Sequence, residues 1–164
     1  MDNKEISSTN ITFEFLRNSK EFLNILLNRI SNGVLLLNKN MELCAFNDPI
    51  KSMFINKKDE ELLYVRCGEA IGCAYTVDEM SKCGETSNCN NCELRVTALE
   101  SYVSRKPVYR KKLSREFYKK DGSKDLKHLH FSVLPFYFKE EYYIIVIIEE
   151  ITELVNLRNM ISSN

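Results

Sequence analysis

Four cysteines lie within one short segment of the chain, Cys73, Cys83, Cys89 and Cys92, with the spacing C-x9-C-x5-C-x2-C. A thiolate is a soft ligand, and four thiolates in one segment can close a tetrahedral site around Zn²⁺ or hold an iron–sulfur cluster. The C-x2-C spacing of the last pair places two sulfurs on one metal from a single turn. Because the segment lacks a long apolar run, thiolate ligation of a metal is the leading explanation for its order.

Other interpretations of these cysteines stay open. They could be small buried hydrophobic residues, or they could form a thiol–disulfide switch without a metal. For a metal, the residue types suit a structural zinc ion and an iron–sulfur cluster equally, so the choice between these two is undecided. Cys67, six residues before Cys73, is a candidate extra ligand, whereas Cys44 lies in a predicted strand and is expected to pack in the core.

Polar residues near the cysteines could support such a centre. Glu69 and Arg95 are candidates to hydrogen-bond the cysteine segment from outside the ligand set. Asn90 and Glu93 have the spacing of a helix cap, which would place Cys89 and Cys92 at a helix N-terminus, where the dipole lowers the pKa of a thiol. His128 and His130 share a strand face at a spacing that can bind metal, but such pairs are more often solvated.

Composition excludes several classes of function. Lys plus Arg and Asp plus Glu are 23 each, which favours neither nucleic acid nor an anionic membrane as a partner. The polar N-terminus lacks a signal-peptide core, and the longest apolar run, Tyr142 to Ile148, is too short to span a bilayer. We therefore expect a cytoplasmic protein, where clustered cysteines indicate metal or redox chemistry. No nucleophile–base set, phosphate loop or paired carboxylate indicates an enzyme.

The elements that must position the cysteines follow from periodicity and turn signals. A helix over 92–105 is expected to bury Cys92, Val96, Leu99 and Val103, and the strand over 142–150 is apolar enough to be a central strand covered on both faces. Two further helices are expected. The first covers 11–30 in two pieces, the second of which is capped at Asn18 or Ser19, and the other covers 151–162. The remaining expected elements are strands over 34–37, 41–46, 113–119 and 127–138 and a short helix over 47–54. This order predicts an α+β domain, a five-stranded antiparallel sheet with helices on one side and flanking N- and C-terminal helices.

Three stretches carry a resemblance to a known family: Asn28–Leu37 (NRISNGVLLL), Phe46-Asn47, and Glu149–Leu154 (EEITEL). In this order, and with the three C-terminal strands, the chain resembles a PAS domain over about 24–154. The middle is similar to a cysteine-rich subgroup of PAS sensors in bacterial signalling proteins. The matching residues are Gly68-Glu69-x-x-Gly72-Cys73, Cys83-Gly84 and Cys89-x-x-Cys92-x-x-Arg95.

The resemblance implies a sensor of redox state or of a gas, acting through a metal centre. It implies an N-terminal helical extension over 1–23, a PAS domain over 24–154 with a cysteine-rich insert over 67–92, and the start of a signalling helix over 155–164. It also implies a homodimer formed through the terminal helices, with a signalling partner in trans or a fused effector that this chain lacks. The alternatives are a dimerisation or small-ligand module with a purely structural zinc site, and an electron carrier.

Overall fold

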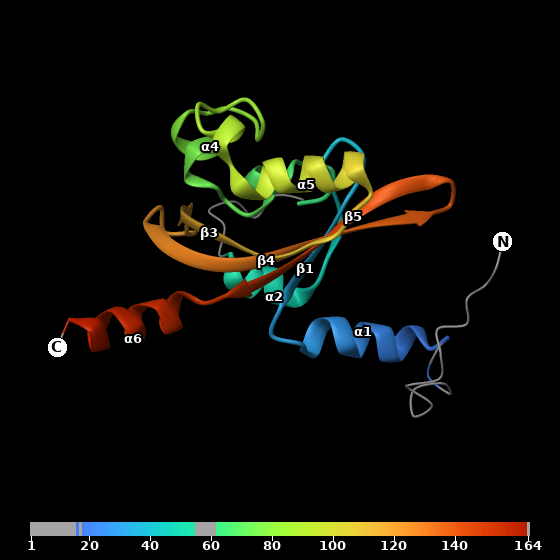
Figure 1. Ribbon diagram of the computed structural model, residues 1–164, viewed down its shortest axis with the longest axis horizontal. Helices are drawn as coiled ribbons and strands as arrows, with labels where there is room; N and C mark the ends of the chain where they lie inside the picture. The colour runs from blue at the N-terminus through green and yellow to red at the C-terminus, as the bar shows by residue number, and fades with distance from the viewer. Residues whose placement is uncertain (1–15, 17, 55–61, 164) are drawn as a thin grey trace.

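Five antiparallel strands form one sheet in the computed structural model, which describes residues 16, 18–54 and 62–163. Across the sheet the order is β2-β1-β5-β4-β3, so the last strand of the chain lies at the centre (Figure 1). The strands are β1 (Gly33–Leu37), β2 (Leu43–Phe46), β3 (Val108–Tyr118), β4 (Lys124–Phe138) and β5 (Glu141–Glu150). The predicted α+β class with a five-stranded antiparallel sheet is confirmed.

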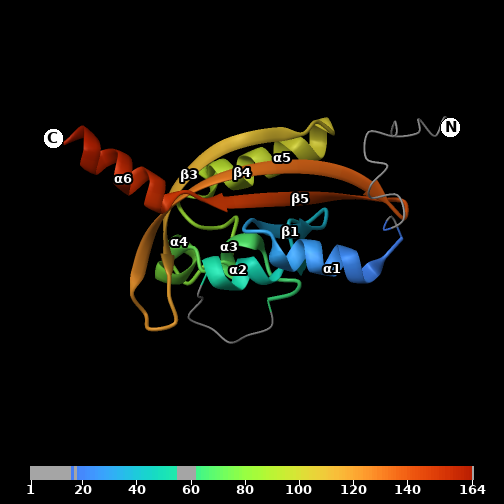
Figure 2. The ribbon, with the colours of Figure 1, turned by 90° about the horizontal axis from the view of Figure 1, so that it is seen from below.

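The helices between β2 and β3 connect the two halves of the sheet, and one further helix lies at each end of the chain. They are α1 (Lys20–Arg29), α2 (Asp48–Met53), α3 (Cys67–Ala70), α4 (Ala74–Asp78), the 3-10 turn η2 (Cys89–Asn91), α5 (Glu93–Ser104) and α6 (Thr152–Ser162). Helix α2 packs against β1, α4 packs against β3, and α5 packs across β3, β4 and β5, whereas α6 projects away from the sheet (Figure 2). No helix in the described part of the chain is long and apolar enough to cross a membrane.

One face of the sheet carries the core. Alternate residues of β4 and β5 are buried and lie opposite one another, as in the pairs Phe131↔Ile148 and Val133↔Val146. Residues of α2, α3 and α5 join the same hydrophobic cluster. The prediction that β5 is covered on both faces is wrong in part, because Ile145 and Ile147 on the opposite face are only half-buried.

Two polar residues fix the N-terminal elements. Ser19 caps α1 by accepting a hydrogen bond from the N–H of Phe22 at 3.1 Å, which confirms it as a helix cap. The buried Asn47 side chain accepts from the N–H of Val34 at 2.8 Å and donates to the carbonyl of Leu27 at 2.7 Å. Asn47 thereby ties α1 to the start of the sheet. Most of the predicted helix before Ser19 lies outside the described residues.

The buried face of α5 differs from the predicted one. Leu94, Thr97, Ala98 and Ser101 are buried, whereas Val103 is 78% exposed. Small side chains at Ala98 and Ser101 let the helix lie close against β3, β4 and β5, so close packing and not the apolar periodicity decided the face. The cap also differs: Cys92, not Asn90, is the N-cap residue of α5.

Strand β3 begins five residues earlier than the predicted start at Leu113. The added residues include Arg110, Lys111 and Lys112, which are exposed and give no strand signal in the sequence. Lys111 and Lys112 belong to the strand because they pair with β4, and Arg110 lies in the β-bulge between Val108 and Lys111. Strand β3 is therefore a long edge strand whose inner side reaches the cysteine segment.

Candidate metal centre

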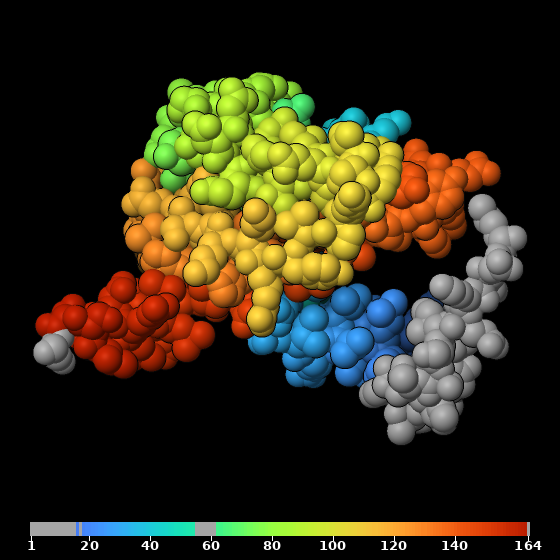
Figure 3. All heavy atoms as spheres, in the orientation of Figure 1, coloured from blue at the N-terminus to red at the C-terminus, as the bar shows by residue number. Residues whose placement is uncertain are grey.

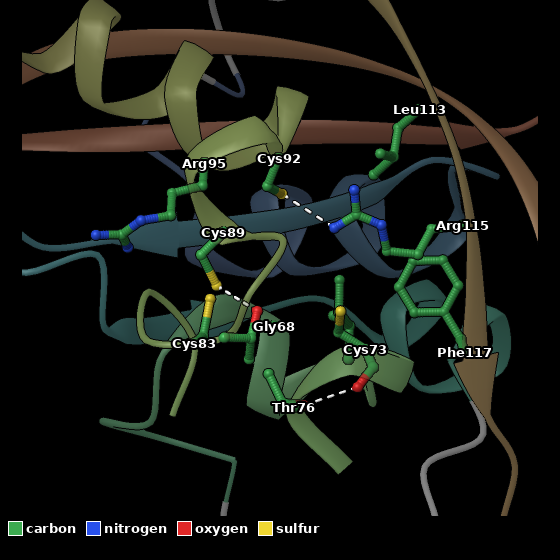
Figure 4. A pocket seen from close by; sticks show the side chains of 12 residues that line it. Gly68, Cys73, Thr76, Cys83, Cys89, Cys92, Arg95, Leu113, Arg115 and Phe117 are labelled. Atoms are coloured by element: carbon green, nitrogen blue, oxygen red, sulfur yellow. Dashed lines mark hydrogen bonds between the residues drawn. The ribbon is translucent and has the colours of Figure 1, made fainter. Parts of the chain in front are cut away.

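Four separate turns bring the predicted cysteines to one cavity of about 30 Å³ (Figure 4). Cys73 precedes α4, Cys83 lies in the loop after α4, Cys89 opens η2, and Cys92 precedes α5. Figure 4 shows the sulfurs of Cys83 and Cys89 turned toward one another, while Cys73 and Cys92 lie beside Arg115. The structure therefore places all four cysteines at one cavity, and metal binding by them stays a prediction.

Backbone contacts fix Cys73 between the cysteine segment and the sheet. Its N–H donates to the carbonyl of Gly68 at 2.9 Å, and its own carbonyl accepts from the hydroxyl of Thr76 at 2.7 Å. An isolated β-bridge joins Cys73 to Phe117 of β3. Through these contacts the first cysteine is held against the edge of the sheet.

Hydrogen bonds favour the ionised form of Cys89, whose pKa is lowered, whereas the pKa values of Cys44, Cys67 and Cys83 are raised. The N–H of Gly84 donates to its sulfur at 3.0 Å, and the Thr86 hydroxyl lies 2.8 Å from the same sulfur. Burial raises the pKa of Cys89, but these hydrogen bonds and the nearby Arg95 outweigh burial, so the pKa lies below its ordinary value. The predicted helix dipole is not the cause, because Cys89 lies in η2 and not on the first turn of α5.

The Cys83 thiol has the opposite character. Burial raises its pKa from 9.0 to about 11, although a hydrogen bond from the backbone of Gly68 and the charge of Arg95 act against that rise. Gly68 lies so close that a Cβ at this position would stand 2.9 Å from the sulfur of Cys83. In the absence of a bound cation, Cys83 is therefore protonated at neutral pH.

Arg115 of β3 is the functional residue that sequence reasoning missed. Its guanidinium donates to the sulfur of Cys92 at 3.2 Å, forms an ion pair with Glu93 at 3.4 Å, and lies 5.4 Å from the ring centre of Tyr75. It also hydrogen-bonds Cys73. The side chain is only 10% exposed. No local pattern marks this residue, because the register of β3 alone brings it to the cysteines.

Arg95 and Glu69, the two residues predicted to hydrogen-bond the cysteine segment, lie in different places. Arg95 lines the cavity, with its guanidinium packed over Gly84. The Glu69 carboxylate instead accepts from the N–H of Arg66 at 3.1 Å and closes the first turn of α3. Arg66 in turn donates to the carbonyl of Cys83 at 2.7 Å. Glu69 therefore acts on the cysteine segment through Arg66 and the position of α3.

The remaining sulfur and imidazole groups lie outside the cavity lining. Cys67 is buried in α3, and burial together with the neighbouring cysteines raises its pKa well above the ordinary value. Cys44 is half-buried rather than fully packed in the core as predicted, and its thiol lies 3.7 Å from the carbonyl of Glu42. The Nδ1 of His128 lies 2.7 Å from the Ser114 hydroxyl. His130 of β4 lies opposite Lys112 of β3.

The donor set fits a thiolate-bound metal in chemistry, although within the described residues no group of three or more Cys, His, Asp or Glu side chains is arranged to hold an ion. Each of the four sulfurs has a donor directed at it: Gly68 at Cys83, Gly84 and Thr86 at Cys89, and Arg115 at Cys73 and Cys92. Such hydrogen bonds stabilise thiolates and tune metal–thiolate centres. Arg115 and Arg95 would offset part of the negative charge that four metal-bound thiolates bring.

The fold can be compared with solved structures. The PAS domain of BvgS from Bordetella pertussis is similar with a TM-score of 0.54 and 18% identity, covering 88% of this chain and 97% of that one. The PAS domain of nitrogen regulation protein NR(II) from Vibrio parahaemolyticus is similar with a TM-score of 0.53 and 11% identity, covering 78% and 96%. No protein-family model and no curated protein matches the sequence. The arrangement of five strands and their helices is therefore the PAS fold.

Proposed function

We propose that this chain is a PAS-type sensory module of a signalling protein in which Cys73, Cys83, Cys89 and Cys92 bind one metal centre, and that the redox state or loss of this centre is the signal. The observation that carries the proposal is the convergence of four cysteines from separate turns on one cavity with a hydrogen-bond donor at every sulfur. A thiolate centre of this kind responds to oxidants or to gases that attack it.

The cysteine segment is built mostly from short turns, so the centre would supply much of its order. Between Cys73 and Cys92 the regular elements are only α4 and η2. Oxidation or loss of the centre would free this segment and allow α5, which begins directly after Cys92, to repack against the sheet. Arg115 would follow, because two of its partners are cysteines of the site.

The contacts around the first residue of α6 support the proposal that the signal leaves the domain through this helix. Arg115 lies opposite Lys127 in the β3–β4 register. Lys127 contacts the two carboxylate oxygens of Glu150 at 2.9 and 3.1 Å, and Glu150 accepts from the Thr152 hydroxyl at 3.0 Å. Thr152, the first residue of α6, also accepts from the N–H of His128 at 3.0 Å. A shift of β3 at Arg115 would therefore act on the start of α6.

The terminal helices favour a homodimer as the signalling unit. In α1, Leu23, Ile25 and Leu26 are each about half exposed or more, and in α6 four apolar residues are at least 50% exposed, Leu154, Leu157, Met160 and Ile161. Helices with such exposed apolar residues are suited to pack against a second copy. The signal would pass from this dimer to a partner in trans or to an effector fused to the module.

A second candidate is a structural zinc ion that staples the segment, in a module that dimerises or binds a small ligand. The cavity volume of about 30 Å³ favours it. A cavity needs roughly 10–15 Å³ to hold one water molecule, so this cavity has room for a single ion. A cubane iron–sulfur cluster would fit only after the cysteine segment moved outward. Zn²⁺ closed by four thiolates has no open position for chemistry.

The test is metal and acid-labile sulfide analysis with an absorption spectrum, on protein purified without oxygen. The Cys89→Ser/Cys92→Ser variant removes two ligands, and Cys44→Ser is the matched control because Cys44 lies outside the cavity. Iron, sulfide and visible bands bleached by air would support the sensing centre. One zinc per chain in a colourless sample would support the structural site. Metal-free protein whose double variant is as stable as the control would refute both.

A further inference from the structure

A cluster of positive charge lies on the first residues of β3, at the free edge of the sheet, and on the turn that leads into it. Arg105, Lys106, Arg110, Lys111 and Lys112 fall within eight residues, and no Asp or Glu occurs between Glu100 and Glu116. All five side chains are exposed. We call these five residues the basic edge. Because the whole chain has no net charge, the basic edge is a local excess and not part of a generally basic surface.

The basic edge has no carboxylate partner in the described part of the chain. None of the ion pairs there includes any of its five residues. Arg105 instead lies over two tyrosine rings, 4.4 Å from the ring centre of Tyr102 and 3.7 Å from that of Tyr142. The other four cations have neither an ion-pair nor an aromatic partner among the described residues, and like charges so close together repel one another. An acidic partner would remove that repulsion.

Backbone conformations in the basic edge are also costly. Arg105 and Arg110 have positive φ values of 59° and 54°, a region that residues other than glycine rarely adopt. The N–H of Arg110 donates to the Ser132 hydroxyl at 3.1 Å, which holds it at the β-bulge. Arg105 takes this conformation as the C-cap residue of α5 and Arg110 takes it in the β-bulge, so the fold holds both arginines in fixed positions.

The main chain beside these cations is available for pairing. Strand β3 is the last strand of the sheet, and only its far end is covered, where the N–H of Tyr118 donates to the carbonyl of Gly72 and Phe117 bridges to Cys73. Because peptide groups alternate in direction along a strand, those of Lys112 and Ser114 point to the same side as those of Tyr118. No described strand pairs with them. In Figure 3 the yellow and orange atoms of this part of the chain lie on the visible face.

We propose that the basic edge binds an extended, carboxylate-rich segment of a partner protein, which adds to β3 alongside Lys112 and Ser114. Strand addition supplies main-chain hydrogen bonds, and the five cations select an acidic sequence. The same cations oppose pairing with β3 of a second copy, because like charges would face each other. A single strand of nucleic acid is less suited, because Tyr109 is the one exposed aromatic residue between Arg105 and Lys112, and one ring makes no stacking platform.

The test uses a short fluorescein-labelled peptide of alternating Glu and Val, whose binding is measured by fluorescence anisotropy at low and physiological salt. The triple variant Arg110→Ala/Lys111→Ala/Lys112→Ala is expected to weaken binding by about tenfold or more and to reduce its salt dependence. The control variant Lys20→Ala/Lys39→Ala/Lys82→Ala removes three exposed lysines elsewhere and should leave binding unchanged. Circular dichroism checks that both variants are folded.

A second measurement separates strand addition from charge alone. Bound peptide should slow hydrogen exchange at the amides of Lys112 and Ser114, and should leave exchange on β1 unchanged. The proposal is overturned if the peptide does not bind, if it binds the triple variant as tightly as the unchanged protein, or if those two amides stay unprotected. It is also overturned if a single-stranded oligonucleotide binds more tightly than the peptide. None of these results depends on a metal at the cysteines.

Discussion

Replacing Arg115 tests the proposed metal centre through a residue that is not itself a ligand. Its guanidinium is nearly buried, donates to the sulfur of Cys92 at 3.2 Å and pairs with Glu93 at 3.4 Å. Arg115→Gln removes the positive charge and keeps a polar side chain on β3. Arg115→Lys keeps the charge but loses the planar fork that reaches two partners at once.

The expected loss is dominated by the cysteine contact. The Glu93 carboxylate is 55% exposed, so its ion pair contributes only about 0–1 kcal/mol. Losing a hydrogen-bond donor to a metal ligand typically lowers metal affinity about 10- to 100-fold, which corresponds to roughly 1.4–2.7 kcal/mol. We therefore expect Arg115→Gln to weaken Zn²⁺ binding by about 10- to 100-fold, and Arg115→Lys to lie between this variant and the unchanged protein.

Zn²⁺ affinity is measured by competition with a chromophoric chelator, and Co²⁺ substitution reports the thiolate charge-transfer bands. Arg110→Gln serves as the control, because Arg110 is exposed on the same strand and does not line the cavity. Urea unfolding of the metal-free proteins separates a loss of fold stability from a loss of metal affinity. If Arg115→Gln binds Zn²⁺ as tightly as the control, with unchanged cobalt bands, Arg115 does not act on the centre and the reasoning fails.

Three further predictions concern the cysteines, the loop and the helix. In metal-free protein Cys89 should react with iodoacetamide at a lower pH midpoint than Cys83, and mass spectrometry of the alkylated peptides distinguishes the two cysteines. Because folding lowers the pKa of Cys89, its contribution to stability is lost as pH falls through that lowered pKa. Because folding raises the pKa of Cys83, its contribution is lost as pH rises from 9.0 to about 11. In urea unfolding, Gly84→Ala should destabilise the protein more than Gly122→Ala. Both glycines have a positive φ, 102° and 83°, which costs an alanine about 1–2 kcal/mol at either position. Only at position 84 would the added Cβ also meet a side chain, because it would stand 2.9 Å from Cζ of Arg95. Ser101→Leu should cost about 1–3 kcal/mol of unfolding free energy through overpacking under α5, against at most about 0.5 kcal/mol for Val103→Leu; equal effects in thermal unfolding would contradict the buried face described above.

The sequence predicts local structure well where one period dominates. The alternation of Leu129, Phe131 and Val133 places β4 in the sheet with the correct face inward, and the apolar run of β5 marks it as a central strand although it does not show which of its faces is buried. Turn residues and the cap at Ser19 mark the boundaries between elements. These features depend on neighbours along the chain, so they can be read without the tertiary structure.

Prediction failed where packing and not periodicity decides the outcome. On α5 the sequence offers two weakly apolar faces, and contact with three strands selects the one with the small residues Ala98 and Ser101. At β3, the charged residues before Leu113 carry no strand signal, and pairing with β4 makes them a strand. In both cases the deciding partner is distant in the sequence.

The cysteine site divides in the same way. The spacing of Cys73, Cys83, Cys89 and Cys92 by itself predicts that they belong to one site, because a short segment cannot separate its thiols far in space. The opposite pKa shifts of Cys83 and Cys89 are decided by the tertiary structure, which buries Cys83 against Gly68 and directs donors at Cys89. The position of Arg115 beside Cys92 is set by the register of an edge strand 23 residues further along the chain, and no local pattern can encode it.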